Sequence, residues 1–135
     1  MHRRRFIALA AALAALPGTA RAFATDYTPG VAEALMAEGR IVLLDFHATW
    51  CPTCAAQERV LQALTTENPA YGQAIAFVKV DWDSHGRGPL AQKLRIPRRS
   101  TLVLLKGEEE LGRIVAGTAR SQIEALLDQG LAAAE

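Results

Sequence analysis

Cysteine, histidine and long apolar runs are scarce in this chain, and each scarcity excludes a class of protein. The 135 residues include only two cysteines and three histidines. A structural zinc site needs about four ligands, and outside the N-terminal segment only His47 and His85 could join the cysteines, without zinc-finger spacing. Covalent haem attachment needs a histidine directly after the second cysteine, where Ala55 stands. The apolar run over residues 6–16 is about half of the ~20 residues that a membrane span requires.

The N-terminus has the pattern of a cleaved export signal. A basic head over residues 1–5 precedes the apolar run, and Pro17 and Gly18 end it. Ala20-Arg21-Ala22 is a small-x-small cleavage sequence. We therefore predict a signal peptide over residues 1–22 and export to the periplasm. The arginines of the basic head are compatible with either a twin-arginine or an ordinary secretory signal.

Without its first 22 residues the chain is mildly acidic. The whole chain has a net charge of +1, and residues 1–22 hold four arginines and no acidic residue. Eleven basic and 14 acidic residues remain, which give a net charge of −3. This balance argues against a nucleic-acid partner. Residues 23–135 have the length of one domain, and they contain no internal repeat or low-complexity linker.

Both cysteines lie in one short motif, Trp50-Cys51-Pro52-Thr53-Cys54, between a predicted strand and a predicted helix. Pro52 suits the first position of a helix, so Cys51 faces the unsatisfied N–H groups of the first turn. The positive end of the helix dipole favours a thiolate, which lowers the pKa of Cys51 and makes it the attacking sulfur. Cys54 lies on the same helix face, nearer the core, and can close a disulfide with Cys51. A ring this small constrains the unfolded chain little, so a purely structural disulfide is disfavoured.

Hydrophobic patterning predicts an α/β domain. The predicted helices cover residues 31–38, 52–66 and 90–94, and a last helix carries an apolar stripe of Ile123, Leu126, Leu127 and Leu131. The predicted strands cover residues 41–46, 75–80, 101–105 and 111–115, with a polar turn over residues 81–86. Helices between the early strands imply parallel crossovers, and the last two strands imply an antiparallel hairpin. We therefore expect a central mixed sheet with helices on both faces.

The chain resembles the thioredoxin family over nearly all of residues 28–131. The resemblance rests on residues 42–54 (VLLDFHATWCPTC), 78–81 (VKVD) and 101–107 (TLVLLKG). With its leader the chain is similar to the exported members, including reductase domains that pass electrons to periplasmic thiol proteins. The resemblance implies a thioredoxin-like fold without a cofactor, with Cys51 as the nucleophile and Cys54 as the resolving thiol.

Further residues gain roles from this resemblance. Asp45 matches the family's buried acid beneath the cysteines, where desolvation raises the pKa of a carboxyl. It could then take the proton of Cys54 while a mixed disulfide resolves; the alternative is an exposed aspartate at the end of a strand. Lys79 matches a lysine that pairs with this acid, or it is an ordinary snorkelling lysine. Trp50 matches the tryptophan that flanks the family's active site.

The sequence departs from the family at Ser100. Thioredoxin-like folds place a cis-proline just before the strand that faces the cysteines, and Ser100 takes that position. A cis bond before a non-proline residue costs about 2.5–4 kcal/mol, so we expect a trans or strained bond here. In an alternative alignment Pro97 is the cis-proline. We further expect the backbone of Ser100 to pair with an extended substrate. The residues expected to contact substrate are Trp50, Pro52, Thr53, Ser100 and Thr101.

The sequence thus predicts an exported thiol–disulfide oxidoreductase, acting as a reductase of periplasmic protein disulfides. Its expected partners are cysteine-containing exported proteins and a membrane electron donor that reduces it again, and it is expected to be a monomer. One alternative is a copper(I)-binding or carrier module, because two thiolates suit copper(I) and Ser100 would remove the family's shielding proline. Against it, no third soft ligand is near and Met36 is the only methionine after the leader. A redox-inactive interaction domain is disfavoured because both cysteines are present.

Overall fold

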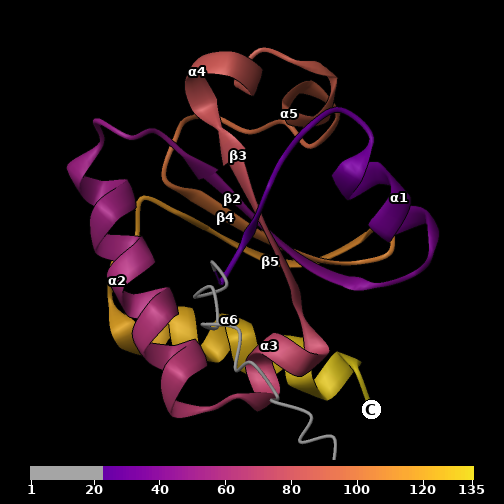
Figure 1. Cartoon of the computed structure of the whole chain (residues 1–135), viewed down its shortest axis with the longest axis vertical. Coiled ribbons are helices and arrows are strands. Elements are labelled where there is room, and N and C mark those ends of the chain that lie inside the picture. Colours follow the sequence, from indigo (N-terminus) through magenta and orange to yellow (C-terminus); the bar gives the residue numbers. More distant parts are fainter. Residues whose placement is uncertain (1–22) are drawn as a thin grey trace, which may run out of the picture.

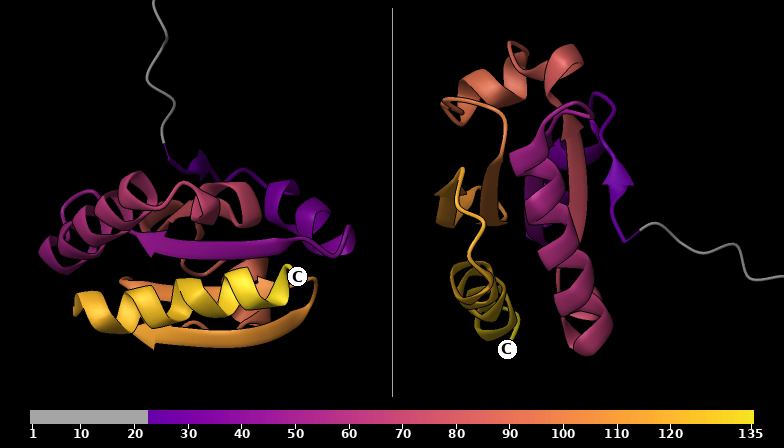
Figure 2. Two further views of the ribbon diagram at one scale, coloured as in Figure 1. Left: turned by 90° about the horizontal axis from the view of Figure 1, so that it is seen from below. Right: turned by 90° about the vertical axis from the view of Figure 1, so that its left-hand side faces the viewer.

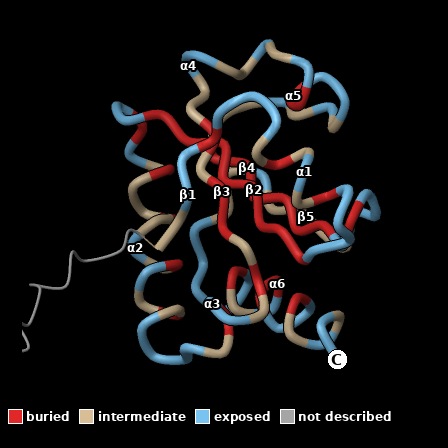
Figure 3. The backbone as a smooth tube through the Cα atoms, turned by 45° about the vertical axis from the view of Figure 1, so that its right-hand side comes forward, coloured by how far each residue is buried: buried red, intermediate tan, exposed pale blue. Residues whose placement is uncertain are grey.

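The computed structural model describes residues 23–135, and the predicted signal peptide lies outside these described residues. One mixed sheet of five strands has the order β1-β3-β2-β4-β5 (Figure 1). The strands are β1 (Thr25–Asp26), β2 (Ile41–His47), β3 (Ala76–Asp81), β4 (Thr101–Lys106) and β5 (Glu109–Val115). The central strand β2 is buried along its whole length (Figure 3), as expected of a continuous apolar run covered on both faces.

Helices cover both faces of this sheet (Figure 2). Within residues 23–135 they are α1 (Val31–Ala37), α2 (Pro52–Glu67), α3 (Ala70–Ala74), α4 (Trp82–His85), α5 (Pro89–Lys93) and α6 (Arg120–Ala133). Buried side chains of α1 and α5 join the core on one face, and those of α2, α3 and α6 join the core on the other. The predicted mixed sheet with helices on both faces is therefore the architecture of the molecule.

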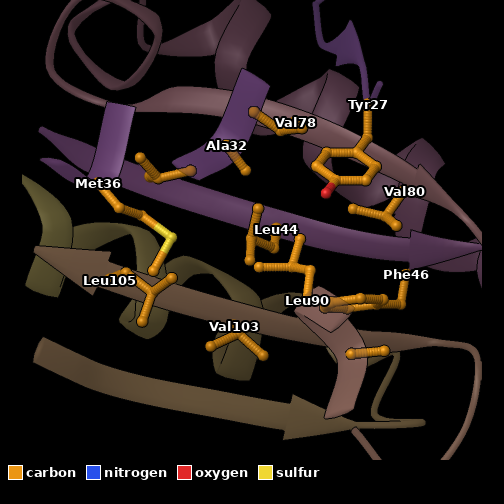
Figure 4. Close-up of a cluster of buried hydrophobic side chains, with 12 residues drawn as sticks. Tyr27, Ala32, Met36, Leu44, Phe46, Val78, Val80, Leu90, Val103 and Leu105 are labelled. Atoms are coloured by element: carbon orange, nitrogen blue, oxygen red, sulfur yellow. The ribbon is translucent and has the colours of Figure 1, made fainter. Parts of the chain in front are cut away.

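Alternate side chains of β2 divide between the two cores, as the period of a strand requires. Leu44 and Phe46 belong to the core under α1 and α5, together with Met36 and Leu90 (Figure 4). Leu43 points to the opposite core, with side chains of α2, α3 and α6. Asp45 follows the same alternation and shares the face of Leu43, which is the face covered by α2. The register of one strand thus places the predicted acid on the side of the cysteine-bearing helix.

The antiparallel part of the sheet begins one strand before the predicted hairpin. β2 and β3 are parallel, whereas β4 pairs antiparallel with β2 from Ile41↔Lys106 to Phe46↔Thr101. β3 ends and β4 begins at the same end of β2, because His47 pairs with Asp81 and Phe46 with Thr101. The connection therefore stays at one end of the sheet, where α4 and α5 lie, and returns the chain in the opposite direction.

Three short elements have no counterpart in the predicted order: the two-residue strand β1 and the helices α3 and α4. They are too short to produce a hydrophobic period. The predicted polar turn is helical over α4 because the Asp81 carboxylate accepts a hydrogen bond from the backbone N–H of Ser84 at 3.0 Å, as an N-cap. None of the helices described within residues 23–135 has the length and apolar character needed to cross a bilayer.

Candidate active site

The two cysteines lie at the start of α2, where the chain leaves the central strand. Cys51 is the N-cap and Pro52 the first helical residue, as the motif predicted. The backbone N–H of Cys54 donates to the Sγ of Cys51 at 3.2 Å, so the sulfur itself caps the helix. Both cysteines are free and buried, with exposed fractions of 2% for Cys51 and 0% for Cys54. A thiolate at Cys51 therefore accepts a backbone hydrogen bond and faces the positive end of a helix.

The hydroxyl of Ser100 lies against both sulfurs. Its Oγ is 3.2 Å from the Sγ of Cys51 and 3.0 Å from the Sγ of Cys54. Of the two alignments predicted, the structure has the one that places Ser100 beside the cysteines, and every peptide bond of residues 23–135 is trans, including the one before Pro97. Ser100 has a φ of 63°, a left-handed conformation that is strained for a residue with a Cβ.

The backbone of Ser100 is fully used inside the protein, which makes one prediction wrong. Its N–H donates to the carbonyl of Phe46 at 2.7 Å, and its carbonyl accepts from the N–H of Ala116 at 2.8 Å. Ser100 is completely buried. It lies between the end of β2 and the segment that follows β5, and not at a sheet edge. Its backbone therefore has no hydrogen bond to offer an extended substrate.

Gln57 completes this arrangement, and the sequence analysis missed it. Its side-chain Nε2 donates to the carbonyl of Ser100 and to the carbonyl of Gly117, both at 2.9 Å. Gln57 is fully buried on α2, among Cys54, Leu61 and Leu64. A polar residue on this otherwise apolar stripe was the available signal, because a buried amide requires buried partners.

The two thiols differ in acidity. Burial acts to raise the pKa of Cys51, but hydrogen bonds from the Cys54 thiol, the Ser100 hydroxyl, the Cys54 N–H and Arg99 outweigh it and lower the pKa to about 7. Burial raises the pKa of Cys54, and its hydrogen bond to Cys51 raises it further. Cys51 is therefore the sulfur that ionises first near neutral pH, which makes it the more reactive thiol.

Asp45 is a buried acid with an unusual titration. It is 3% exposed, and neither carboxyl oxygen has a hydrogen-bond partner among the described residues. Burial raises its pKa to about 7; the charges of Glu58 and Cys51 add to this rise, and the charge of Lys79 opposes it. A carboxyl that gains and loses its proton near neutral pH suits the predicted role of proton acceptor for Cys54.

The predicted pairing of Lys79 with Asp45 is wrong. The two residues are register partners on β2 and β3, but the Nζ of Lys79 donates to Oε1 of Glu58 at 2.5 Å. The Lys79 and Glu58 side chains are 26% and 23% exposed. A partly exposed ion pair keeps the ammonium partly hydrated, whereas a contact with the buried carboxyl would remove more of its water.

Trp50 marks the exposed side of the site. Its side chain is 56% exposed, and its Nε1 donates to Oδ2 of Asp83 at 2.9 Å. The guanidinium of Arg99 lies 4.4 Å from the centre of the indole ring, as a cation–π contact. These contacts hold the indole from both the α4 side and the segment before β4.

The other predicted substrate contacts divide into exposed and buried residues. Pro52 is exposed and Thr53 is partly exposed. Thr101 is fully buried, and its Oγ1 donates to the carbonyl of Arg98 at 2.7 Å. The prediction that Thr101 contacts substrate is therefore wrong, because as the first residue of β4 it turns its side chain into the protein.

The described residues also define the donors available to a metal. Within residues 23–135, no group of three or more histidine, cysteine, aspartate or glutamate side chains is placed to hold an ion. His47 is buried, and desolvation lowers the pKa of its imidazole. The copper(I) alternative rests on the two sulfurs and on the absence of the shielding proline at Ser100, and it stays a prediction.

Comparison with known proteins places this geometry in a family. The thioredoxin family model matches residues 25–129. "Thioredoxin H-type" of Brassica oleracea is 34% identical over 88 residues, which cover 65% of this chain and 66% of the relative. "Thioredoxin C-2" of Corynebacterium nephridii is 34% identical over 90 residues, covering 67% of this chain and 79% of the relative.

Solved structures agree in fold. The crystal structure of Trxlp from Edwardsiella tarda is similar with a TM-score of 0.66 and 31% identity, covering 76% of this chain and 96% of that one. Thioredoxin of Malassezia sympodialis is similar with a TM-score of 0.63 and 28% identity, covering 73% of this chain and 84% of that one. These neighbours have the thioredoxin-like fold that the sequence predicted for this chain.

Proposed function

This chain belongs to the thioredoxin family of thiol–disulfide oxidoreductases, and we propose that it reduces disulfides of exported proteins in the periplasm. Thioredoxins act on cysteine-containing protein substrates and are monomeric. The single observation that carries the proposal is the placement of Cys51: its sulfur caps α2, accepts the N–H of Cys54 and has a pKa of about 7. Such a sulfur is substantially thiolate at neutral pH, and the thiolate is the species that attacks a disulfide.

The first step is the attack of the Cys51 thiolate on one sulfur of a substrate disulfide. A bond forms between the Cys51 Sγ and that sulfur, the substrate S–S bond breaks, and the other substrate sulfur leaves as a thiolate that takes a proton from water. Trp50 and Pro52 are exposed and Thr53 is partly exposed beside Cys51, and all three would contact the substrate chain. The product of this step is a mixed disulfide.

The second step is resolution by Cys54. Its thiol gives a proton to the Asp45 carboxylate, and the resulting thiolate attacks the Cys51 sulfur of the mixed disulfide. The Cys51–Cys54 bond forms, the bond between Cys51 and the substrate breaks, and the second substrate sulfur leaves as a thiolate that takes a proton from water. Two electrons have then passed from the dithiol to the substrate disulfide. Burial raises the pKa of Asp45 to about 7, so its carboxylate can accept a proton near neutral pH.

The cellular setting is supported by the sequence. Residues 1–22 have the basic head, apolar run and cleavage sequence of an export signal. A reductant in an oxidising compartment needs a supply of electrons, so we propose that a membrane electron donor reduces the Cys51–Cys54 disulfide after each turnover. Cysteine-containing exported proteins would be the substrates.

A disulfide-reduction assay tests the activity. The protein is supplied with excess dithiothreitol, and the reduction of insulin disulfides is followed with time. The wild-type protein should accelerate the reaction strongly, and Cys51→Ser should leave only the background rate. An equal rate for wild type and Cys51→Ser would refute the proposal. Separating periplasm from cytoplasm in a bacterium that expresses the full chain tests the proposed location. A full-length chain found in the cytoplasm would contradict export to the periplasm.

A further inference from the structure

The Ser100 hydroxyl is buried between the two sulfurs of the site. Ser100 is completely buried, and its Oγ is 3.2 Å from the Cys51 Sγ and 3.0 Å from the Cys54 Sγ. Its backbone is fixed on both sides, by the carbonyl of Phe46 and by the N–H of Ala116. With the Oγ in this position, rotation of the O–H about the Cβ–Oγ bond decides which sulfur receives its hydrogen bond.

A hydroxyl has one proton to donate and two lone pairs that accept. It can therefore donate to one sulfur while it accepts from the other, but it cannot donate to both at once. In the reduced protein Cys51 is the more acidic thiol. The consistent arrangement has both the Cys54 thiol and the Ser100 hydroxyl donating to the Cys51 thiolate.

We propose that Ser100 is a catalytic residue whose hydroxyl donates first to the Cys51 thiolate and then, when Cys51 is in the mixed disulfide, to the Cys54 thiolate. Formation of the mixed disulfide removes the charge from Cys51, so the O–H bond turns to the sulfur that becomes charged next. Ser100 transfers no proton: the proton of Cys54 goes to the Asp45 carboxylate. This inference rests on the proposed function and adds a hydrogen-bond donor to both of its steps.

Charged groups near the sulfurs also change the pKa values of Cys51 and Asp45. Arg99, from the segment before β4, lowers the pKa of Cys51, and the charge on Cys51 in turn raises the pKa of Asp45 on β2. Lys79 on β3 and Glu58 on α2 form an ion pair that acts on Asp45 with opposite signs. None of these groups is changed when the Ser100 hydroxyl is removed.

Ser100→Ala tests the proposal, because alanine keeps the Cβ and loses only the hydroxyl. The probe is 5,5′-dithiobis(2-nitrobenzoate), which releases one coloured thiolate when Cys51 attacks and a second when Cys54 resolves the mixed disulfide. A lost hydrogen bond to a charged sulfur should slow each release about tenfold below neutral pH and raise the pKa of Cys51 by about one unit. Thiolate absorbance in the ultraviolet measures that pKa directly.

Ser100→Gly separates the hydroxyl from backbone strain and guards against a folding defect. Glycine adopts a positive φ without strain, so this variant should fold at least as stably as the wild type and still show both slowed releases. Unchanged rates and an unchanged Cys51 pKa in both variants would overturn the role of Ser100. A slowed first release with an unchanged second release would overturn the two-step role. A wild-type protein that releases no thiolate would instead refute the proposed function.

Discussion

Asp45 and Lys79 are register partners on adjacent parallel strands, yet the Lys79 ammonium binds Glu58, and the Asp45 carboxyl has no hydrogen-bond partner within residues 23–135. A buried carboxyl in this state resists ionisation, and its pKa rises to about 7. The ion pair still acts on Asp45 through its charges, since Lys79 lowers this pKa and Glu58 raises it. The site therefore holds an acid whose charge costs folding energy and whose pKa suits the proposed proton transfer from Cys54.

Replacing Asp45 should stabilise the protein at high pH and not at low pH. The folded state holds the Asp45 proton more tightly than the unfolded state, so the wild type loses stability as pH rises from about 4 to about 7 and then levels off. Asp45→Asn has no such loss. We expect its free energy of unfolding to exceed that of the wild type by at most about 4 kcal/mol above neutral pH, and by little near pH ~4. Urea denaturation at the two pH values measures the difference; an equal difference at both would contradict it.

The Glu58–Lys79 pair should tune the pKa of Asp45 in opposite directions. Lys79→Met removes the charge that lowers this pKa, so the carboxyl should titrate at a higher pH than in the wild type. Glu58→Gln removes a charge that raises it, so the carboxyl should titrate at a lower pH. NMR titration of the Asp45 side-chain carbon follows both variants. A shift in the same direction for both would show that the pair acts through structure and not through charge.

Trapping experiments should distinguish the two cysteines. With Cys54→Ser, Cys51 can attack a substrate but nothing resolves the complex, so mixed disulfides should accumulate. With Cys51→Ser, the remaining thiol is fully buried and has a raised pKa, so almost none should form. Non-reducing electrophoresis of complexes with a disulfide-containing protein gives the yields. Equal yields from the two variants would remove Cys51 as the nucleophile.

Ser100→Pro should destabilise the folded protein. Proline lacks the backbone N–H that donates to the carbonyl of Phe46 at 2.7 Å. Its ring also fixes φ at about −65°, whereas Ser100 has a φ of 63°. We expect a loss of about 3 kcal/mol or more in the free energy of unfolding. Ser100→Gly, which accepts the positive φ, is the matched control and should lose none. A proline variant as stable as the wild type would mean that this segment adopts a different backbone.

Gln57→Leu should weaken the support beneath Ser100. The variant leaves the carbonyl of Gly117 without its Gln57 donor and removes one of two donors to the carbonyl of Ser100. We expect a loss of about 1–3 kcal/mol, the usual cost of stranding buried polar groups. Gln62→Leu, at an exposed position of α2, is the control and should change stability by less than about 0.5 kcal/mol. Thermal melts of both variants compare them; equal losses would show that the Gln57 hydrogen bonds are unimportant.

Local information was enough to predict the strand β2, the start of α2 at Pro52 and the N-cap position of Cys51. A continuous apolar run has few choices but a buried strand, and proline suits the first turn of a helix wherever that helix lies. The same run left Asp45 open between a buried acid and an exposed residue at the strand end; the family resemblance favoured burial, and the structure buries it.

Only the tertiary structure decided the contacts between segments distant in sequence. Whether Lys79 binds Asp45 or Glu58 depends on how close the Glu58 carboxylate of α2 lies to β3. It also depends on which of the two partners leaves the Lys79 ammonium hydrated. Whether Ser100 faces a substrate or the two sulfurs depends on the hydrogen bonds of its backbone to Phe46 and Ala116. Phe46 lies 54 positions before Ser100 in the chain, and Ala116 lies 16 positions after it. The sequence determines the local conformational preference of each residue. Contacts between distant segments are set by packing, because many partners could satisfy the same hydrogen-bonding group and only the assembled fold brings one of them within reach.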